Sequence, residues 1–187
     1  MAAIHRLCND TEGFARRVAQ LSGQDPSKCY QCGKCTAGCP VAFAMDLDPA
    51  RVMRLVQLGM EDAALDSKAI WVCSACETCA SRCPQEVELP LVMDALKSMA
   101  LKSGRRADRD VATFNAAFLD SVRKRGRASE IEAIVLYKMR SRHLFQDVDK
   151  GLAMFLKRKL PLMPHKAPNA DEVARIFSAV EQLERNG

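Results

Sequence analysis

The chain has 187 residues, of which 48% are hydrophobic and only 5% aromatic, and its formal net charge is +5. This length fits one domain or a small domain with extensions, and a composition rich in Ala, Leu, Val and Met favours helices. No apolar run reaches the roughly 18 residues that a membrane helix needs, and residues 1–10 lack the apolar core of a signal peptide. We therefore expect a soluble, cytoplasmic, mainly α-helical protein with no membrane span.

The N-terminal segment, residues 1–28, is predicted to contain one amphipathic helix at 10–22. Its apolar residues recur on one face at helical spacing: Phe14, Val18 and Leu21. The pair Ser22-Gly23 is expected to end this helix.

The central segment, residues 29–104, carries two copies of one cysteine pattern, C-x2-C-x2-C-x3-C-P. The first copy comprises Cys29, Cys32, Cys35 and Cys39, followed by Pro40, and the second comprises Cys73, Cys76, Cys79 and Cys83, followed by Pro84. This run is a signature of bacterial ferredoxins that bind cubane [4Fe–4S] clusters. Two copies predict two clusters, and two clusters in one small protein indicate electron transfer.

The fourth cysteine of each run lies too far along the chain to close its own cluster easily, and in two-cluster ferredoxins it ligates the other cluster. We therefore expect crossed ligand sets. Cluster 1 would be held by Cys29, Cys32, Cys35 and Cys83, and cluster 2 by Cys73, Cys76, Cys79 and Cys39. The exchange would staple the two halves together and keep the clusters within electron-transfer reach of each other.

Other roles for these cysteines explain less of the pattern. Structural zinc sites use paired C-x2-C elements and four ligands in all, so the third cysteine of each run would have no role. Disulfides are disfavoured by the odd count of nine cysteines and the absence of a secretory signal. Thiol redox chemistry at a C-x2-C pair does not explain the repeat. Cys8 lies outside both runs, either as a free thiol or as a ligand for a partner's cofactor.

Each cysteine run is followed by a predicted amphipathic helix that begins at a proline and ends at a glycine. The first begins at Asp48-Pro49, with Asp48 as N-cap, and ends at Gly59. The second begins at Pro90 and ends at Gly104. Their apolar faces comprise Val52, Leu55 and Val56 in the first helix, and Val92, Leu96 and Met99 in the second. The two halves therefore form an internal repeat, and no alternating strand pattern accompanies it.

The C-terminal segment, residues 105–187, is predicted to be a helical extension for packing or partner docking. Three apolar stripes indicate helices: Val111, Phe114, Phe118 and Val122; Ile131, Ile134, Val135 and Met139; Val173, Ile176, Phe177, Val180 and Leu183. Pro161, Pro164 and Pro168 indicate an extended linker before the last helix. Packing on its own core is the default expectation for such a helix.

Basic clusters recur in this extension, at 105–106, 123–125, 138–142 and 157–159. We interpret them first as solvated helix faces and next as a docking surface for an acidic partner. Nucleic-acid binding is disfavoured because no binding module accompanies them, and because two clusters of roughly −2 each would reduce the net charge to about +1. The sequence shows no nucleophile–base pair and no glycine-rich nucleotide motif, so the chain is expected to carry electrons and to catalyse nothing alone.

The residues around the cysteines are more specific than the cysteines themselves. They read Leu21-Ser-Gly-Gln, Cys29-Tyr-Gln-Cys-Gly-Lys-Cys-Thr-Ala-Gly-Cys-Pro, Arg54-Leu-Val-Gln-Leu-Gly, Lys68-Ala-Ile-Trp-Val-Cys and Cys76-Glu-Thr-Cys. Over roughly residues 12–105 the chain resembles the C subunit of heterodisulfide reductases. The resemblance implies an α-helical ferredoxin-like domain, as in succinate dehydrogenase iron–sulfur subunits, with all eight cysteines of the two runs as ligands.

The resemblance also implies two partners. One is an A-type subunit with flavin and iron–sulfur clusters, and the other is a B-type cysteine-rich subunit that holds the disulfide-reducing site. The chain would relay electrons between them. Two alternatives stay open: an iron–sulfur subunit of another oxidoreductase, of benzoyl-CoA reductase type or sulfur-oxidising, and a cluster-bearing regulator.

Overall fold

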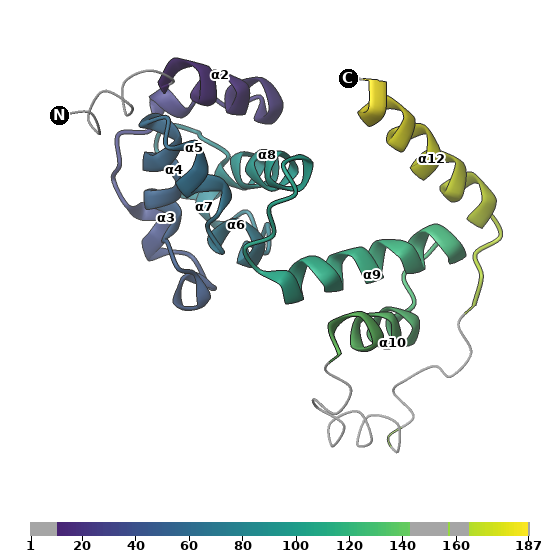
Figure 1. Ribbon diagram of the computed structural model, residues 1–187. Helices are drawn as coiled ribbons and strands as arrows, with labels where there is room; N and C mark the ends of the chain where they lie inside the picture. Colours follow the sequence, from purple (N-terminus) through teal and green to yellow (C-terminus); the bar gives the residue numbers. More distant parts are fainter. Residues whose placement is uncertain (1–10, 143–156, 158–164, 187) are drawn as a thin grey trace. The chain divides into compact units, whose positions relative to one another are not determined.

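The computed structural model describes residues 11–142, 157 and 165–186, and all regular structure in this part of the chain is helical (Figure 1). The mainly α class is thereby confirmed for the described residues. In them, no helix is both long and apolar enough to cross a membrane. The predictions for Cys8, Pro161 and Pro164, and for the basic residues 158–159, lie outside the described residues.

The chain divides into two compact units, residues 1–108 and 109–187. All eight cysteines of the two runs belong to the first unit. Its elements are α2 (Thr11–Ser22), η1 (Pro26–Lys28), α3 (Lys34–Ala37), η2 (Ala42–Ala44), α4 (Pro49–Gln57), α5 (Glu61–Leu65), α6 (Ala69–Val72), α7 (Thr78–Ser81) and α8 (Leu89–Lys102). The short helices α3 and α7 each follow the second cysteine of a run and carry the third.

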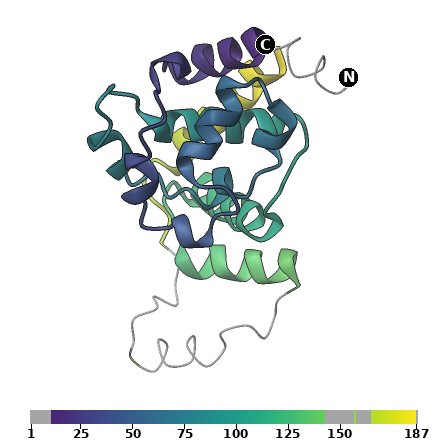
Figure 2. The same ribbon diagram turned by 90° about the vertical axis from the view of Figure 1, so that its left-hand side faces the viewer.

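The core of the first unit lies where α2 and α4 pack on each other and α2, α5 and α6 pack on α8 (Figure 2). Its side chains are almost completely buried: Phe14, Val18, Val52, Met53, Val56, Leu65, Ile70, Val92, Met93 and Leu96. Each large apolar side chain removed from water contributes about 1.5–3 kcal/mol to stability. This buried layer therefore stabilises the helices that flank the cysteine loops. The predicted helix at 10–22 is confirmed, although Leu21 is 55% exposed and does not share the buried face.

Helices α4 and α8 follow the predicted repeat. At the start of α4, Asp48 Oδ1 accepts the backbone N–H of Arg51 at 3.0 Å, and Pro49 takes the first helical position. In α8, Pro90 lies in the first turn. The two helices end near Gly59 and Gly104, whose φ angles of +67° and +71° are left-handed. A residue without a Cβ adopts this conformation most easily.

The first cysteine loop is attached to α4 through its N-cap. Thr36, next to Cys35, donates its hydroxyl to Asp48 Oδ1 at 2.9 Å and accepts the N–H of Ala50 at 3.1 Å. The residue that begins α4 therefore also fixes the position of the first cysteine run.

The second unit contains α9 (Arg109–Arg125), α10 (Glu130–Ser141) and α12 (Ala170–Asn186), with α10 and α12 both packed on α9. The helices agree with the predicted stripes, but the stripes are not buried: Phe114, Phe118, Ile134, Val135, Met139, Ile176, Val180 and Leu183 are each 40% or more exposed. Small residues are buried instead, namely Ala112, Ala117, Ser121, Ala133 and Ala170. The helices approach closely on their small-residue faces, so the larger apolar side chains stay partly exposed, although the ring of Phe114 packs edge-on against Tyr137 of α10.

Candidate iron–sulfur centre

The two cysteine loops share one unusual backbone conformation. Gln31 and Gly33 in the first loop have φ angles of +63° and +74°, and Ala75 and Glu77 in the second have +49° and +61°. Left-handed φ values cost non-glycine residues roughly 1–2 kcal/mol each, and such strain collects at functional sites. Identical placement in both loops shows that the repeat extends to backbone geometry.

The loops meet at matching positions. Gly38 precedes Cys39 as Arg82 precedes Cys83, and a Cβ at Gly38 would lie 2.7 Å from Arg82 Nη1. Helices α3 and α7 are also in contact. Equivalent residues that touch each other lie beside a local two-fold axis, so the fourth cysteine of each run lies near the junction with the other run.

One cavity gathers cysteines from both runs. It is lined by Cys73, Cys76 and Cys79 from the second run and by Cys39 from the first. Six apolar residues and two hydroxyl residues complete the lining: Val41, Met45, Pro49, Leu89, Pro90 and Met93, with Ser74 and Thr78. The four thiols predicted for cluster 2 therefore surround one shared, largely apolar space.

Three of the other cysteines lie near Tyr30. Desolvation raises the pKa of the Tyr30 phenol, and the neighbouring Cys32, Cys83 and Cys29 add to this effect. Burial raises the pKa of the Cys35 thiol, and the nearby Cys29 adds to this effect. Cys83 of the second run therefore lies near Tyr30 of the first run, as do Cys29 and Cys32, which are also predicted ligands of cluster 1.

The environment of Cys73 and Cys79, which are partly buried, suits a cationic iron centre. Burial raises the pKa of Cys73, and it raises the pKa of Cys79 to about 11. Burial therefore favours the neutral thiol form of both side chains, and the nearby Lys97 offsets this only in part at Cys73. A bound iron cation stabilises the thiolate form, because it bonds directly to the cysteine sulfur. Among the described residues, no three Cys, His, Asp or Glu side chains converge on a single point as ligands of one metal ion do.

Hydrogen-bond donors approach two of the cysteine sulfurs, and a third cysteine is bonded to Thr78. The backbone N–H of Val87 points to Cys83 Sγ at 3.3 Å, and the side-chain amide of Gln31 lies 3.6 Å from Cys29 Sγ. The Cys76 thiol donates to Thr78 Oγ1 at 3.4 Å, and hydrogen bonds with the side chain and backbone of Thr78 lower the pKa of Cys76. Donors to the sulfurs are one of the factors that set the reduction potential of a cluster.

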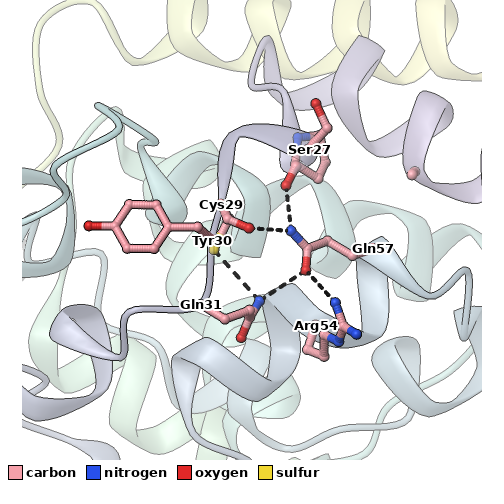
Figure 3. Close-up of a pocket in the computed structure, with 8 residues that line it drawn as sticks. Ser27, Cys29, Tyr30, Gln31, Arg54 and Gln57 are labelled. Atoms are coloured by element: carbon pink, nitrogen blue, oxygen red, sulfur yellow. Dashed lines mark hydrogen bonds between the residues drawn. The ribbon is translucent and has the colours of Figure 1, made fainter.

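Sequence reasoning missed the side chains that support the first loop. Gln31, Gln57 and Arg54 form a hydrogen-bonded group beside Cys29 (Figure 3). Within the repeat, Gln31 occupies the position of Ala75 in the second loop. This difference between otherwise similar loops is the sequence signal that could have identified Gln31 as a functional residue.

Comparison with known proteins agrees with this geometry. Residues 28–88 match the 4Fe-4S dicluster domain. The chain is 35% identical over 113 residues to the second iron-sulfur C subunit of CoB–CoM heterodisulfide reductase of Methanocaldococcus jannaschii, covering 56% of this chain and 60% of that protein. It is 39% identical over 88 residues to the corresponding iron-sulfur C subunit of Methanopyrus kandleri, covering 46% of each chain.

A further relative is the C2 subunit of the H2/formate:CoB–CoM heterodisulfide, ferredoxin reductase of Methanococcus maripaludis, 38% identical over 104 residues, which cover 51% of this chain and 56% of that protein. The chain thus spans about half the length of the curated relatives it matches. The cysteine-bearing part of the chain is therefore a 4Fe-4S dicluster domain with two [4Fe–4S] clusters, similar to that of the iron-sulfur C subunits of CoB–CoM heterodisulfide reductases.

Proposed function

We propose that the chain is an electron-transfer subunit that relays electrons through its two clusters between two partner subunits. One partner is an A-type subunit with flavin and iron–sulfur clusters, and the other is a B-type cysteine-rich catalytic subunit of a heterodisulfide reductase-like complex. The observation that carries the proposal is the cavity that brings Cys39 of the first run together with Cys73, Cys76 and Cys79 of the second.

The ligand sets of the proposal are crossed. Cys29, Cys32, Cys35 and Cys83 hold cluster 1, while Cys73, Cys76, Cys79 and Cys39 hold cluster 2. Each run then supplies one ligand to the other cluster, so both clusters stay within one small helical unit. The contact between α3 and α7 and the proximity of Gly38 to Arg82 support this exchange.

Exposure of the cysteines suggests how electrons enter and leave. Cys32 and Cys76, the second cysteines of the two runs, are exposed, whereas the other ligands are partly buried. Each cluster is therefore covered on one side by the helical core and approaches the surface at one cysteine. The clusters supply the redox chemistry. The protein holds them close together, limits access of water to cluster 2 through the apolar lining of its cavity and leaves one edge of each open to a partner.

Membership of a multi-subunit complex is inferred from the relatives, whose names describe iron-sulfur C subunits of CoB–CoM heterodisulfide reductases. The A-type and B-type partners are inferred from the resemblance of the residues around the cysteines to that family. We place the relay in the cytoplasm, where a reducing environment keeps the ligand thiols available. The exposed apolar side chains of α9, α10 and α12 support a docking role for the second unit.

The test is an anaerobic affinity purification of the tagged full chain from its native host, with a tagged two-cluster ferredoxin as control. We expect a flavoprotein and a cysteine-rich B-type subunit to co-purify with the chain and not with the control. Reduced chain should then pass electrons to the recovered B-type subunit in stopped-flow mixing. Recovery with subunits of an unrelated oxidoreductase, or the absence of clusters in the purified chain, would contradict the proposal.

A further inference from the structure

A chain of side-chain amides connects α4 to the first cysteine loop (Figure 3). Gln57, the last residue of α4, donates its side-chain Nε2 to the backbone carbonyls of Pro26 at 2.9 Å and Cys29 at 2.6 Å. Its Oε1 accepts from Gln31 Nε2 at 3.1 Å and from Arg54 Nη1 at 3.3 Å. Gln57 is therefore saturated with partners on both ends of its amide.

These partners determine which way both amides point. Backbone carbonyls only accept hydrogen bonds and a guanidinium only donates them, so the nitrogen of Gln57 faces the carbonyls and its oxygen faces Arg54. Gln31 meets that same oxygen and must present its own NH2 group. The orientation of Gln31 thus follows from hydrogen-bond chemistry alone, without the usual ambiguity between amide oxygen and nitrogen.

The Gln31 NH2 group has two hydrogens, and Gln57 uses one. The second is directed at Cys29 Sγ, 3.6 Å from the nitrogen. Both glutamines are partly buried, so water competes less for this contact than it would at the surface. The left-handed φ of +63° at Gln31 is the backbone conformation in which its side chain reaches both partners.

We propose that Gln31, held by Gln57 and Arg54, is a positioning residue that donates a fixed N–H to the Cys29 sulfur and thereby raises the reduction potential of cluster 1. The inference rests on the proposed function, in which Cys29 is a ligand of that cluster. Reduction adds negative charge that spreads onto the ligand sulfurs, and a donor stabilises the more negative state.

The second half of the repeat lacks this device. Helices α4 and α8 correspond through their buried pairs Val52–Met53 and Val92–Met93. On this helix register Gln57 corresponds to Lys97 and Arg54 corresponds to Asp94, whereas the register of the cysteine runs pairs Gln31 with Ala75. Lys97 and Asp94 form an ion pair at 3.6 Å, and Ala75 has no side-chain donor. The amide donor is therefore specific to the first loop.

The test is an EPR-monitored redox titration of the full holoprotein and of Gln31→Ala. Alanine suits this position, because Ala75 occupies the matching left-handed site with φ +49°. We expect one of the two midpoint potentials to fall and the other to stay constant. A roughly tenfold weaker preference for the reduced state corresponds to about 59 mV for one electron.

Two further variants distinguish a specific effect on one midpoint potential from the general structural effects of a substitution. Gln31→Gly removes the amide without backbone strain and should reproduce the shift. Gln20→Ala is the matched control, since it removes an exposed side-chain amide on α2 in the same unit. It should leave both midpoints unchanged.

A spectroscopic measurement tests the contact directly. With side-chain ¹⁵N-labelled glutamine, pulsed EPR of the reduced protein should show a ¹⁵N coupling that disappears in Gln31→Ala. If both variants at position 31 retain two clusters and unchanged midpoints, or shift both midpoints equally, the inference is wrong and the proposed function stands. If the unaltered chain fails to hold two clusters, the proposed function fails and the inference fails with it.

Discussion

Crossed ligation makes a sharp prediction about pairs of cysteine substitutions. Cys39 is proposed to belong to the cluster of the second run, whose exposed member is Cys76, while Cys32 is the exposed member of the first run. The variant Cys39→Ala/Cys76→Ala therefore removes two ligands from one cluster and none from the other. The variant Cys39→Ala/Cys32→Ala removes one ligand from each.

The expected magnitudes follow from the dicluster domain, which holds two clusters of four irons each. Cys39→Ala/Cys76→Ala should retain one intact cluster, with four irons per chain and half the EPR spin count of the unaltered reduced protein. Cys39→Ala/Cys32→Ala should retain no four-thiolate cluster, because each is left with three protein ligands. Iron and sulfide analysis after anaerobic reconstitution, followed by EPR quantitation, measures both quantities.

The comparison does not require either signal to be assigned in advance. Both doubles remove Cys39 and one exposed second cysteine, so their general effects on folding are matched. If each run ligated its own cluster, the pattern would reverse, and Cys39→Ala/Cys32→Ala would keep the intact cluster. That reversal would refute the crossed assignment, and it would also refute the interpretation of the shared cavity as the site of cluster 2.

Two further predictions concern the helices that support the site. Asp48→Ala removes the N-cap bond to Arg51 N and the bond from the Thr36 hydroxyl; we expect it to lower the free energy of unfolding by about 2 kcal/mol, measured as a lower urea midpoint of the holoprotein. The control Asp48→Asn keeps both acceptor contacts and should stay within about 0.5 kcal/mol of the unaltered protein. An equal loss in both variants would contradict the capping role. Gly126→Ala places a Cβ 2.7 Å from Ala170 Cα at φ +73°, so we expect it to lower the free energy of unfolding by about 2–4 kcal/mol and to speed hydrogen exchange in α12. The control Gly104→Ala, at φ +71° with no atom near the new Cβ, should lower it by only about 1 kcal/mol. Similar losses in both variants would show that the start of α12 does not contact Gly126 closely.

The sequence was a good guide to the helices of the first unit. The Asp-Pro start of α4 and the prolines and glycines around α8 act within a few residues, so their effect is readable without tertiary structure. The buried faces were also predictable for Phe14, Val18, Val52 and Val92, because apolar periodicity reports the side that leaves water. Leu21 was misassigned, because it lies in the last turn of α2 and its side chain is more than half exposed in the described part of the chain.

The second unit was harder to predict for a specific reason. Periodicity identified the helices but selected the large apolar residues as the packed face. In the structure the packed faces are made largely of small residues such as Ala117 and Ala133, while Phe118 and Met139 stay exposed. Hydrophobic patterns do not distinguish a face that packs within the unit from one that is left for another surface.

The chemistry of the protein is determined by its sequence alone, since cluster binding depends on residue type and short spacing, and both are explicit in the two cysteine runs. Tertiary structure decided which residues surround those cysteines. Gln31 and Gln57 are 26 residues apart, and Cys39 shares a cavity with cysteines more than thirty positions away. Contacts between distant segments depend on how helices pack, and no local pattern records that packing. The cofactor was therefore predictable from the sequence, whereas the donor proposed to tune it became visible only in the fold.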